Sequence, residues 1–367
     1  MIKLSSASLG SEEKEAVDRV LDAKYLGMGQ EVMLFESELE AFFSHKTRVA
    51  CVNTGTSALQ LALQACGIGQ GDEVLIPSLT YVASFQAASA TGATPIACDI
   101  DLKNGCLDFL AARKKLTPRT KAVMYVHYGS GIGDRERLFS FAHEFGLRVI
   151  EDAAHSFGGY DKGERIGERG DILCFSFDGI KNITCGEGGA VVSSDEKVID
   201  KIRDLRLLGV QKDTEQRYAG KRSWDFDVTE QGWRYHMSNM NAAIGRAQLK
   251  KIDGFGKKRR SLAQVYKQHL QGLPIECLDI DLDNSVPHIF PVLVEKGKRT
   301  SLRDFLLSHH IETGVHYKPN HLLTKYRSHD CPQAEAFGER ILSLPLHVGL
   351  DEGEIIRVSQ SIGQYFA

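Results

Sequence analysis

The chain has 367 residues, of which 42% are hydrophobic and 25% are charged, an ordinary composition for a soluble globular protein of about two domains. The formal net charge of -3 gives no electrostatic case for a nucleic acid or an anionic membrane as partner. The N-terminus lacks the apolar stretch of a signal peptide, and no apolar run approaches the roughly 20 residues that span a bilayer. We therefore expect a cytoplasmic protein.

The eight cysteines are scattered along the chain, and no two of them form a Cys-x-x-Cys pair. Disulfide frameworks belong to short secreted chains, and structural zinc sites need close pairs of ligands. The pattern predicts free thiols in a reducing compartment and no metal site.

The first predicted element is a helix near the N-terminus, with Ser11 as its N-cap and two glutamates in its first turn. From about residue 48, short apolar runs alternate with helical stretches. The runs predict strands at 49–52, 73–77, 95–98, 122–126, 148–150, 171–177 and 189–193. This alternation predicts an α/β fold with a mainly parallel sheet covered on both faces, whose ligands bind beyond the carboxyl ends of the strands.

The second half of the chain is less regular. A polar stretch at 211–230 predicts a loop. An apolar stripe from Met240 to Ala247 predicts a helix that ends at Gly254-Phe255-Gly256. Helix and strand patterns continue beyond residue 257 without regular alternation. We predict a large domain over 1–250 and a smaller C-terminal α+β domain over 251–367.

Three segments carry residues suited to chemistry. Gly55, Thr56 and Ser57 lie between a predicted strand and a predicted helix, where free N–H groups form an anion site, although an ordinary capped helix is the commoner explanation of this motif alone. Asp152 follows an apolar strand, where its carboxylate is placed either to hold a protonated heterocyclic nitrogen or to be solvated. Lys181 lies between a strand and a glycine cluster at 186–189, and a partly desolvated lysine is a usable amine for Schiff-base chemistry.

These segments together resemble the DegT/DnrJ/StrS sugar aminotransferases, which depend on pyridoxal 5'-phosphate (PLP). The resemblance rests on several motifs in the order of that family: Tyr25 to Gly29, Gly55 to Leu59, Pro77 to Ser84, Glu151 to His155, Phe175 to Gly189, Gly232 to Leu249, and His316 to His321. It covers nearly the whole chain. It implies the fold type I architecture of aspartate aminotransferase and a homodimer with shared active sites.

The resemblance also implies roles for individual residues. Lys181 would bind the cofactor covalently and move protons, Asp152 would pair with the pyridine nitrogen, and His155 would lie near the phenolic oxygen. Tyr81 would stack on the ring, and Gly55, Thr56, Ser57 and Ser176 would hold the phosphate. The family often has an asparagine from the partner subunit at this phosphate, and here that position is Arg234. The sugar site would include His316, Tyr317 and His321.

The implied reaction moves an amino group from L-glutamate to a nucleotide-linked 3-keto or 4-keto deoxy sugar, in two half-reactions through pyridoxamine phosphate (PMP). Such amino sugars serve surface polysaccharides, including the O-antigen of lipopolysaccharide, or glycosylated metabolites. Two other functions stay open. A PMP-dependent sugar dehydratase shares the fold, but those enzymes replace the lysine that Lys181 matches. A non-catalytic sensor would keep the fold without the reaction.

Overall fold

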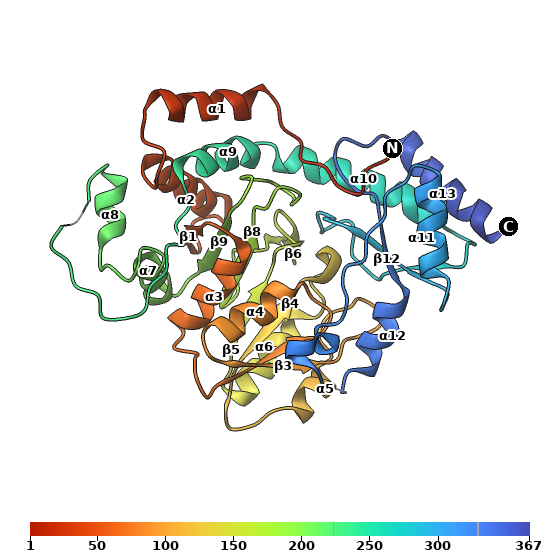
Figure 1. Cartoon of the computed structure of the whole chain (residues 1–367), viewed down its shortest axis with the longest axis horizontal. Coiled ribbons are helices and arrows are strands. Elements are labelled where there is room, and N and C mark those ends of the chain that lie inside the picture. Colours follow the sequence, from red (N-terminus) through yellow and green to blue (C-terminus); the bar gives the residue numbers. More distant parts are fainter. Residues whose placement is uncertain (223, 329) are drawn as a thin grey trace.

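The computed structural model describes residues 1–222, 224–328 and 330–367, so position 223 of the predicted loop lies outside the described residues. A seven-stranded sheet has the order β1-β9-β8-β5-β4-β2-β3 (Figure 1). Strand β9 runs antiparallel to both of its neighbours, and the other neighbouring pairs are parallel. The strands are β1 (Arg48–Val52), β2 (Glu73–Pro77), β3 (Thr94–Cys98), β4 (Thr120–Val126), β5 (Arg148–Asp152), β8 (Ile172–Ser176) and β9 (Gly189–Ser193).

Helices cover both faces of this sheet, because alternate residues of its strands point to opposite sides. In β8, Ile172 and Cys174 join a cluster with α3 and α7, whereas Leu173 and Phe175 join a second cluster with α2. All five residues of β8 are buried, as expected for a strand covered on both faces. The helices of this part are α2 (Gln30–Phe42), α3 (Gly55–Ala65), α4 (Val82–Ala90), α5 (Phe109–Lys114), α6 (Arg135–Phe145) and α7 (Glu196–Leu205).

A second, smaller sheet follows toward the C-terminus and consists of three antiparallel strands in the order β10-β11-β12. Its elements are α10 (Ile252–His269), β10 (Ile275–Cys277), β11 (Phe290–Val294), α11 (Arg299–Ser308), α12 (Pro332–Arg340), β12 (Ile341–Leu344) and α13 (Glu352–Phe366). The large mixed sheet and the smaller α+β part confirm the predicted fold class. The division at residues 250 and 251 stays a prediction.

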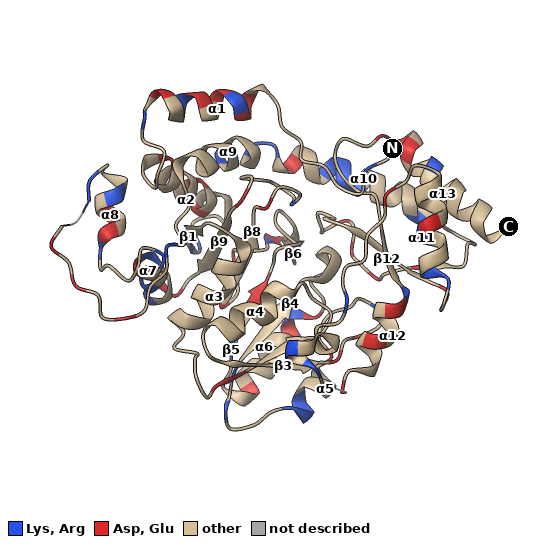
Figure 2. Ribbon diagram, viewed as in Figure 1, with Lys and Arg blue, Asp and Glu red and all other residues tan. Residues whose placement is uncertain are grey.

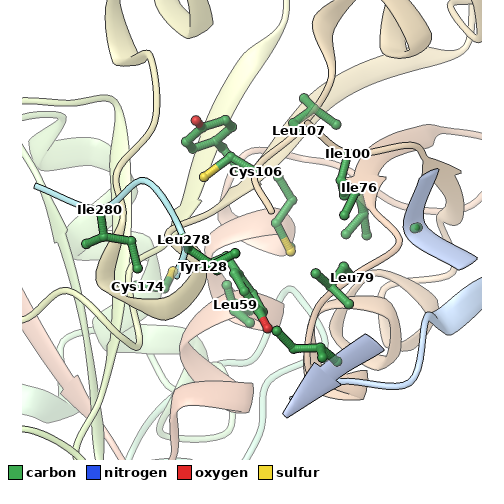
Figure 3. Packing of buried hydrophobic residues seen from close by; sticks show 14 of the residues in the cluster. Leu59, Ile76, Leu79, Ile100, Cys106, Leu107, Tyr128, Cys174, Leu278 and Ile280 are labelled. Carbon is green, nitrogen blue, oxygen red and sulfur yellow. The ribbon is translucent and has the colours of Figure 1, made fainter. Parts of the chain in front are cut away.

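The two parts share one buried apolar cluster. Leu59 of α3, Ile76 of β2 and Cys174 of β8 belong to it, as do Leu278 and Ile280, which follow β10 (Figure 3). Because apolar burial contributes about 25 cal/mol per Å², this shared cluster stabilises the smaller part against the large sheet. The cavity described below lies where segments of both parts meet.

Three local predictions were wrong. The first helix, α1 (Ser11–Asp22), is capped by Gly10 rather than Ser11, and the Glu13 carboxylate accepts a 2.6 Å hydrogen bond from the Gly10 N–H. The predicted loop at 211–230 contains α8 (Asp213–Tyr218), and α10 runs through Gly254 and Gly256 after α9 (Asn239–Leu249) has ended.

Several short elements lie outside the two main sheets. Strands β6 (Tyr160–Asp161) and β7 (Glu164–Arg165) form a hairpin, and 3-10 turns cover 128–130, 320–322 and 324–326. Acidic and basic residues are interspersed along α1 rather than segregated by sign (Figure 2). No helix among the described residues is long and apolar enough to cross a membrane.

Candidate active site

A cavity of about 460 Å³ lies at the carboxyl edge of the large sheet. This edge is where ligands of open α/β sheets bind. The cavity brings together residues from β5 and β8, from the turn after β1 and from the C-terminal part, which are far apart in the sequence. Its lining includes Gly55, Thr56, Tyr81, Asp152, His155, Ser176, Asp178, Lys181, Glu187, His316 and Tyr317.

One end of the cavity is the start of α3. Thr54 caps this helix by accepting a 3.0 Å hydrogen bond from the Ser57 N–H, and the N–H groups of a first turn have no acceptor within their helix. The turn that precedes α3 follows Val52, the last residue of β1. In the sheet, Gly189 of β9 pairs with Val52 on one side and with Ser176 of β8 on the other, so the turn lies close to Ser176. These N–H groups and the Ser176 hydroxyl suit a phosphate.

Gly189 has to be glycine for this arrangement. A Cβ at this position would lie 2.5 Å from the Thr54 carbonyl oxygen and 2.8 Å from the Gly55 nitrogen. A Cβ at Gly55 would in turn lie 2.8 Å from the Cβ of Ser176. Gly189, in the glycine cluster after Lys181, therefore allows the turn at the start of α3 to approach the sheet, backbone against backbone.

The opposite wall of the cavity carries Asp152, the last residue of β5. Its Oδ2 accepts a 2.8 Å hydrogen bond from the Ser84 hydroxyl. Burial raises the pKa of the Asp152 carboxyl, while the Ser84 hydrogen bond and the charge of Lys181 lower it. A buried carboxylate with few donors is suited to a cationic partner, such as a protonated ring nitrogen.

The neighbouring residue Glu151 does not line the cavity and fixes the end of β5. Its carboxylate is completely buried and accepts hydrogen bonds of 2.7 and 2.8 Å from Arg135, and its Oε2 lies 3.0 Å from Nε2 of His127. Burial raises the pKa of Glu151, but the hydrogen bonds from His127 and Arg135 outweigh burial and hold it at about 2. This ion pair anchors the strand that presents Asp152.

Lys181 extends into the cavity from the loop between β8 and β9. Burial lowers its pKa to about 8, against the opposing attraction of Asp152 and Asp178. About one tenth of the amine is therefore uncharged at pH 7, far more than for an ordinary lysine, and the uncharged amine is the form that attacks a carbonyl. The side-chain amine also lies 3.5 Å from Nε2 of His288.

A group of rings forms another wall. His155 Nε2 lies 3.1 Å from the Tyr317 hydroxyl, and the rings of Tyr81 and Tyr317 have centroids 5.7 Å apart. Burial, followed by the charges of Lys181 and His316, lowers the pKa of His155 well below its usual value, so the ring is neutral. Its buried Nδ1 has no hydrogen-bond partner among the described residues. Tyr81 is 58% exposed, so its ring is available to stack on a ligand.

Three predicted site residues lie outside this lining. The Ser57 hydroxyl bonds to Asn53 at 2.8 Å and belongs to the helix cap. Arg234 is exposed and does not line the cavity of its own chain. His321 is completely buried, with Nδ1 2.6 Å from the Ser78 hydroxyl and Nε2 3.1 Å from Glu335, so its ring is engaged in packing rather than in the sugar site.

Sequence reasoning also missed residues that the fold brings to the site. Ser84 ends the motif that begins at Pro77, but its residue type gave no sign of a role. The structure shows its buried hydroxyl bonded to Asp152, as a buried hydroxyl needs a partner. His288 stands in a segment without any recognisable motif. Glu187 belongs to the glycine cluster and also lines the cavity.

The residues present fit PLP. The start of α3 and Ser176 form a phosphate cradle in which a Cβ on Gly55 has no room. Asp152 offers a buried carboxylate to a ring nitrogen, His155 has an unpartnered Nδ1 for a polar atom, and Lys181 lies in the same cavity as a partly uncharged amine. Among the described residues, no group of three or more His, Cys, Asp or Glu side chains is placed to hold a metal ion.

Comparison with known proteins agrees with this geometry. The model of the DegT/DnrJ/EryC1/StrS aminotransferase family matches residues 7–363. The aminotransferase TlmJ from Streptoalloteichus hindustanus superposes with a TM-score of 0.92 at 29% identity, over 100% of this chain and 99% of that chain.

Two further solved structures bear on the cofactor. DesV from S. venezuelae, solved in complex with a ketimine intermediate, has a TM-score of 0.88 and 36% identity over 97% of this chain and 94% of that chain. Spr1654 from Streptococcus pneumoniae, solved in a PLP form, has a TM-score of 0.90 and 27% identity over 99% of this chain and 98% of that chain. A PMP form of Spr1654 is similar, with a TM-score of 0.91.

Proposed function

We propose that this chain, which belongs to the DegT/DnrJ/EryC1/StrS aminotransferase family and is a PLP-dependent sugar aminotransferase, transfers the amino group of L-glutamate to a nucleotide-linked 3-keto or 4-keto deoxy sugar. The product would be an amino sugar for a surface polysaccharide such as O-antigen or for a glycosylated metabolite, made in the cytoplasm. The observation that carries the proposal is one cavity that holds both the Lys181 amine and the Asp152 carboxylate.

Each side chain of the cavity has a separate role in this reaction. When bound, PLP supplies an electron sink that stabilises negative charge at the carbon that loses a proton. Lys181 would bind the cofactor and, once its Nζ is free, would accept that proton and return it. Asp152 would keep the ring nitrogen protonated, and the N–H groups of Gly55 and Thr56 with the Ser176 hydroxyl would hold the phosphate. Neutral His155 would face the phenolic oxygen, and Tyr81 would stack on the ring.

The keto sugar would enter past the exposed face of Tyr81 and contact His316 and Tyr317. These residues line the same cavity as Lys181, and His316 is held by a 2.8 Å contact between its Nδ1 and the Ser343 hydroxyl. The apolar and ring surfaces around the half-buried Lys181 would limit the access of water to its amine, which favours proton transfer to carbon over loss of the proton to solvent.

We further propose a homodimer in which Arg234 of the partner subunit completes the phosphate site. The support is that Arg234 is exposed and does not line its own cavity, and that a guanidinium binds phosphate in bidentate fashion. Mixing Lys181→Ala chains with Arg234→Ala chains should then restore activity, up to roughly one quarter of the native level, because mixed dimers contain one intact site. Failure to restore any activity, with mixed dimers demonstrated, would contradict the shared site.

The reaction itself is tested with the purified chain, L-glutamate and a panel of nucleotide-linked 3-keto and 4-keto sugars. Release of 2-oxoglutarate together with one amino sugar, detected by mass spectrometry, is the expected result. Lys181→Ala is the matched control and should bind PLP without covalent attachment and release nothing. A native chain that converts no member of the panel, although it reacts with glutamate, would contradict the proposed acceptor. A chain that reacts with no amino donor would contradict the donor half as well.

A further inference from the structure

His288 lies against the reactive lysine, although it belongs to the C-terminal part of the chain. Its Nε2 is 3.5 Å from Nζ of Lys181, and its ring centroid is 4.7 Å from that of His155. The residue is only 4% exposed. A buried polar ring in contact with a reactive amine has to be matched to one protonation state of that amine.

The segment that carries His288 is held from three directions. Asn182, the neighbour of Lys181, donates a 3.0 Å hydrogen bond to the carbonyl of Val286. The buried guanidinium of Arg259 in α10 donates to the carbonyls of Pro287 and His288, each at 3.1 Å. The backbone N–H of His288 donates to the Ser130 hydroxyl at 2.8 Å. The backbone that carries the imidazole is therefore fixed beside the lysine.

The free ring nitrogen decides which tautomer fits. Nδ1 of His288 is buried and has no partner among the described residues. Unpaired buried N–H groups are rarer than unpaired acceptors, so the hydrogen belongs on Nε2, which faces the lysine. Burial, with the charges of Lys181 and its neighbours, keeps the ring neutral by lowering its pKa. Nε2–H is then a donor aimed at the amine.

We propose that His288 is a positioning residue that donates a hydrogen bond from Nε2 to the uncharged amine of Lys181 and holds that amine in place whenever it is not bound to the cofactor. This rests on the assignment of Lys181 to the reaction. The contact favours the free base, which is the form that adds to the cofactor and accepts a proton from the amino donor. The charged and titratable groups that face the pair are Asp152, His155, Asp178, Arg259 and His316.

The test measures Lys181 in the full chain after removal of the cofactor. Trace acetylation over a pH series, read by mass spectrometry of the peptide that contains residue 181, gives the midpoint at which the amine loses its proton. His288→Phe keeps the ring volume and burial but removes the donor, and should raise the midpoint by about half to one pH unit, the size of one net hydrogen bond. His288→Gln retains an N–H donor and should lie between the two.

His347→Phe is the matched control, because His347 is also buried but neither of its ring nitrogens bonds to the Lys181 amine or to any other described group, and it should leave the midpoint unchanged. If His288→Phe does not fold, His288→Leu carries the same expectation. An unchanged or lowered midpoint in either folded variant would overturn the inference. In the cofactor-loaded enzyme, the acid limb of the kcat profile for the donor half-reaction should move to higher pH with little change in KM. An unshifted midpoint beside full transaminase activity would reject the His288 contact and leave the proposed function intact.

Discussion

The hydroxyl of Ser84 donates a hydrogen bond of 2.8 Å to Oδ2 of Asp152. Ser84 is completely buried near the start of α4, and its oxygen also lies 2.8 Å from the hydroxyl of Thr80. The contact ties α4 to the end of β5. It stabilises the charged form of a carboxyl group whose pKa burial raises, so Ser84 helps to keep Asp152 ionised for its cationic partner.

Ser84→Ala should therefore weaken PLP binding about three- to tenfold, the equivalent of one net hydrogen bond. Absorbance titration of the cofactor-free chain with PLP gives the dissociation constant. Ser89→Ala is the control, since Ser89 lies on the same helix and bonds to Tyr326 instead of to the cavity. Equal affinities in the Ser84 variant and the native chain would show that the hydroxyl does not support Asp152.

The lowered pKa of Lys181 makes cofactor capture depend on pH. Only the uncharged amine attacks the aldehyde, and burial moves the Lys181 pKa from 10.5 to about 8. The capture rate of the cofactor-free chain should thus rise about tenfold per pH unit below this value and level off above it. Stopped-flow absorbance over a pH series that brackets this value measures the profile. A rate that keeps rising well above it would mean that the amine is solvated.

Gly189→Ala should damage the phosphate cradle. The added Cβ would lie 2.5 Å from the Thr54 carbonyl, and overpacking of this kind costs about 1–3 kcal/mol. We expect a lower unfolding temperature and roughly a tenfold or greater loss of affinity for PLP. Gly254→Ala in α10 is the matched control, because no neighbouring group of the described residues lies within 4 Å of a Cβ added there, and it should leave both quantities nearly unchanged. Native-like PLP affinity in Gly189→Ala would contradict the close approach.

His321 should matter for stability and not for substrate binding. It bridges Ser78 and Glu335 in the packed junction between the large sheet and α12. His321→Leu removes the ring partner of the Ser78 hydroxyl, which keeps only the backbone N–H of residue 321, and we expect a loss of about 1–3 kcal/mol in the free energy of unfolding. Denaturant unfolding and steady-state kinetics separate the two effects, with KM for the sugar expected to change less than about twofold. A large rise in KM for the sugar at unchanged stability would contradict this prediction and show that His321 contributes to sugar binding.

The sequence alone was sufficient for the parts that depend on local pattern. Apolar runs of a few residues separated by amphipathic stretches predicted the strands of the large sheet. They did so because buried strands and amphipathic helices each require a characteristic spacing of apolar residues along the chain. The motifs around Gly55, Asp152 and Lys181 predicted the family, and the roles expected of these residues came from that resemblance. The cap of α1 and the helix within 211–230 were missed, since polar segments carry weak periodic signals.

Only the tertiary structure decided which distant groups meet. The register that pairs Gly189 with both Val52 and Ser176 depends on strand order, which no local pattern contains. Chain folding likewise brought His288 to Lys181 and took His321 out of the cavity, because contacts between side chains far apart in the sequence depend on how separate elements pack. Residue order thus determined the chemistry available to this protein, and packing determined its geometry and the protonation states of its groups.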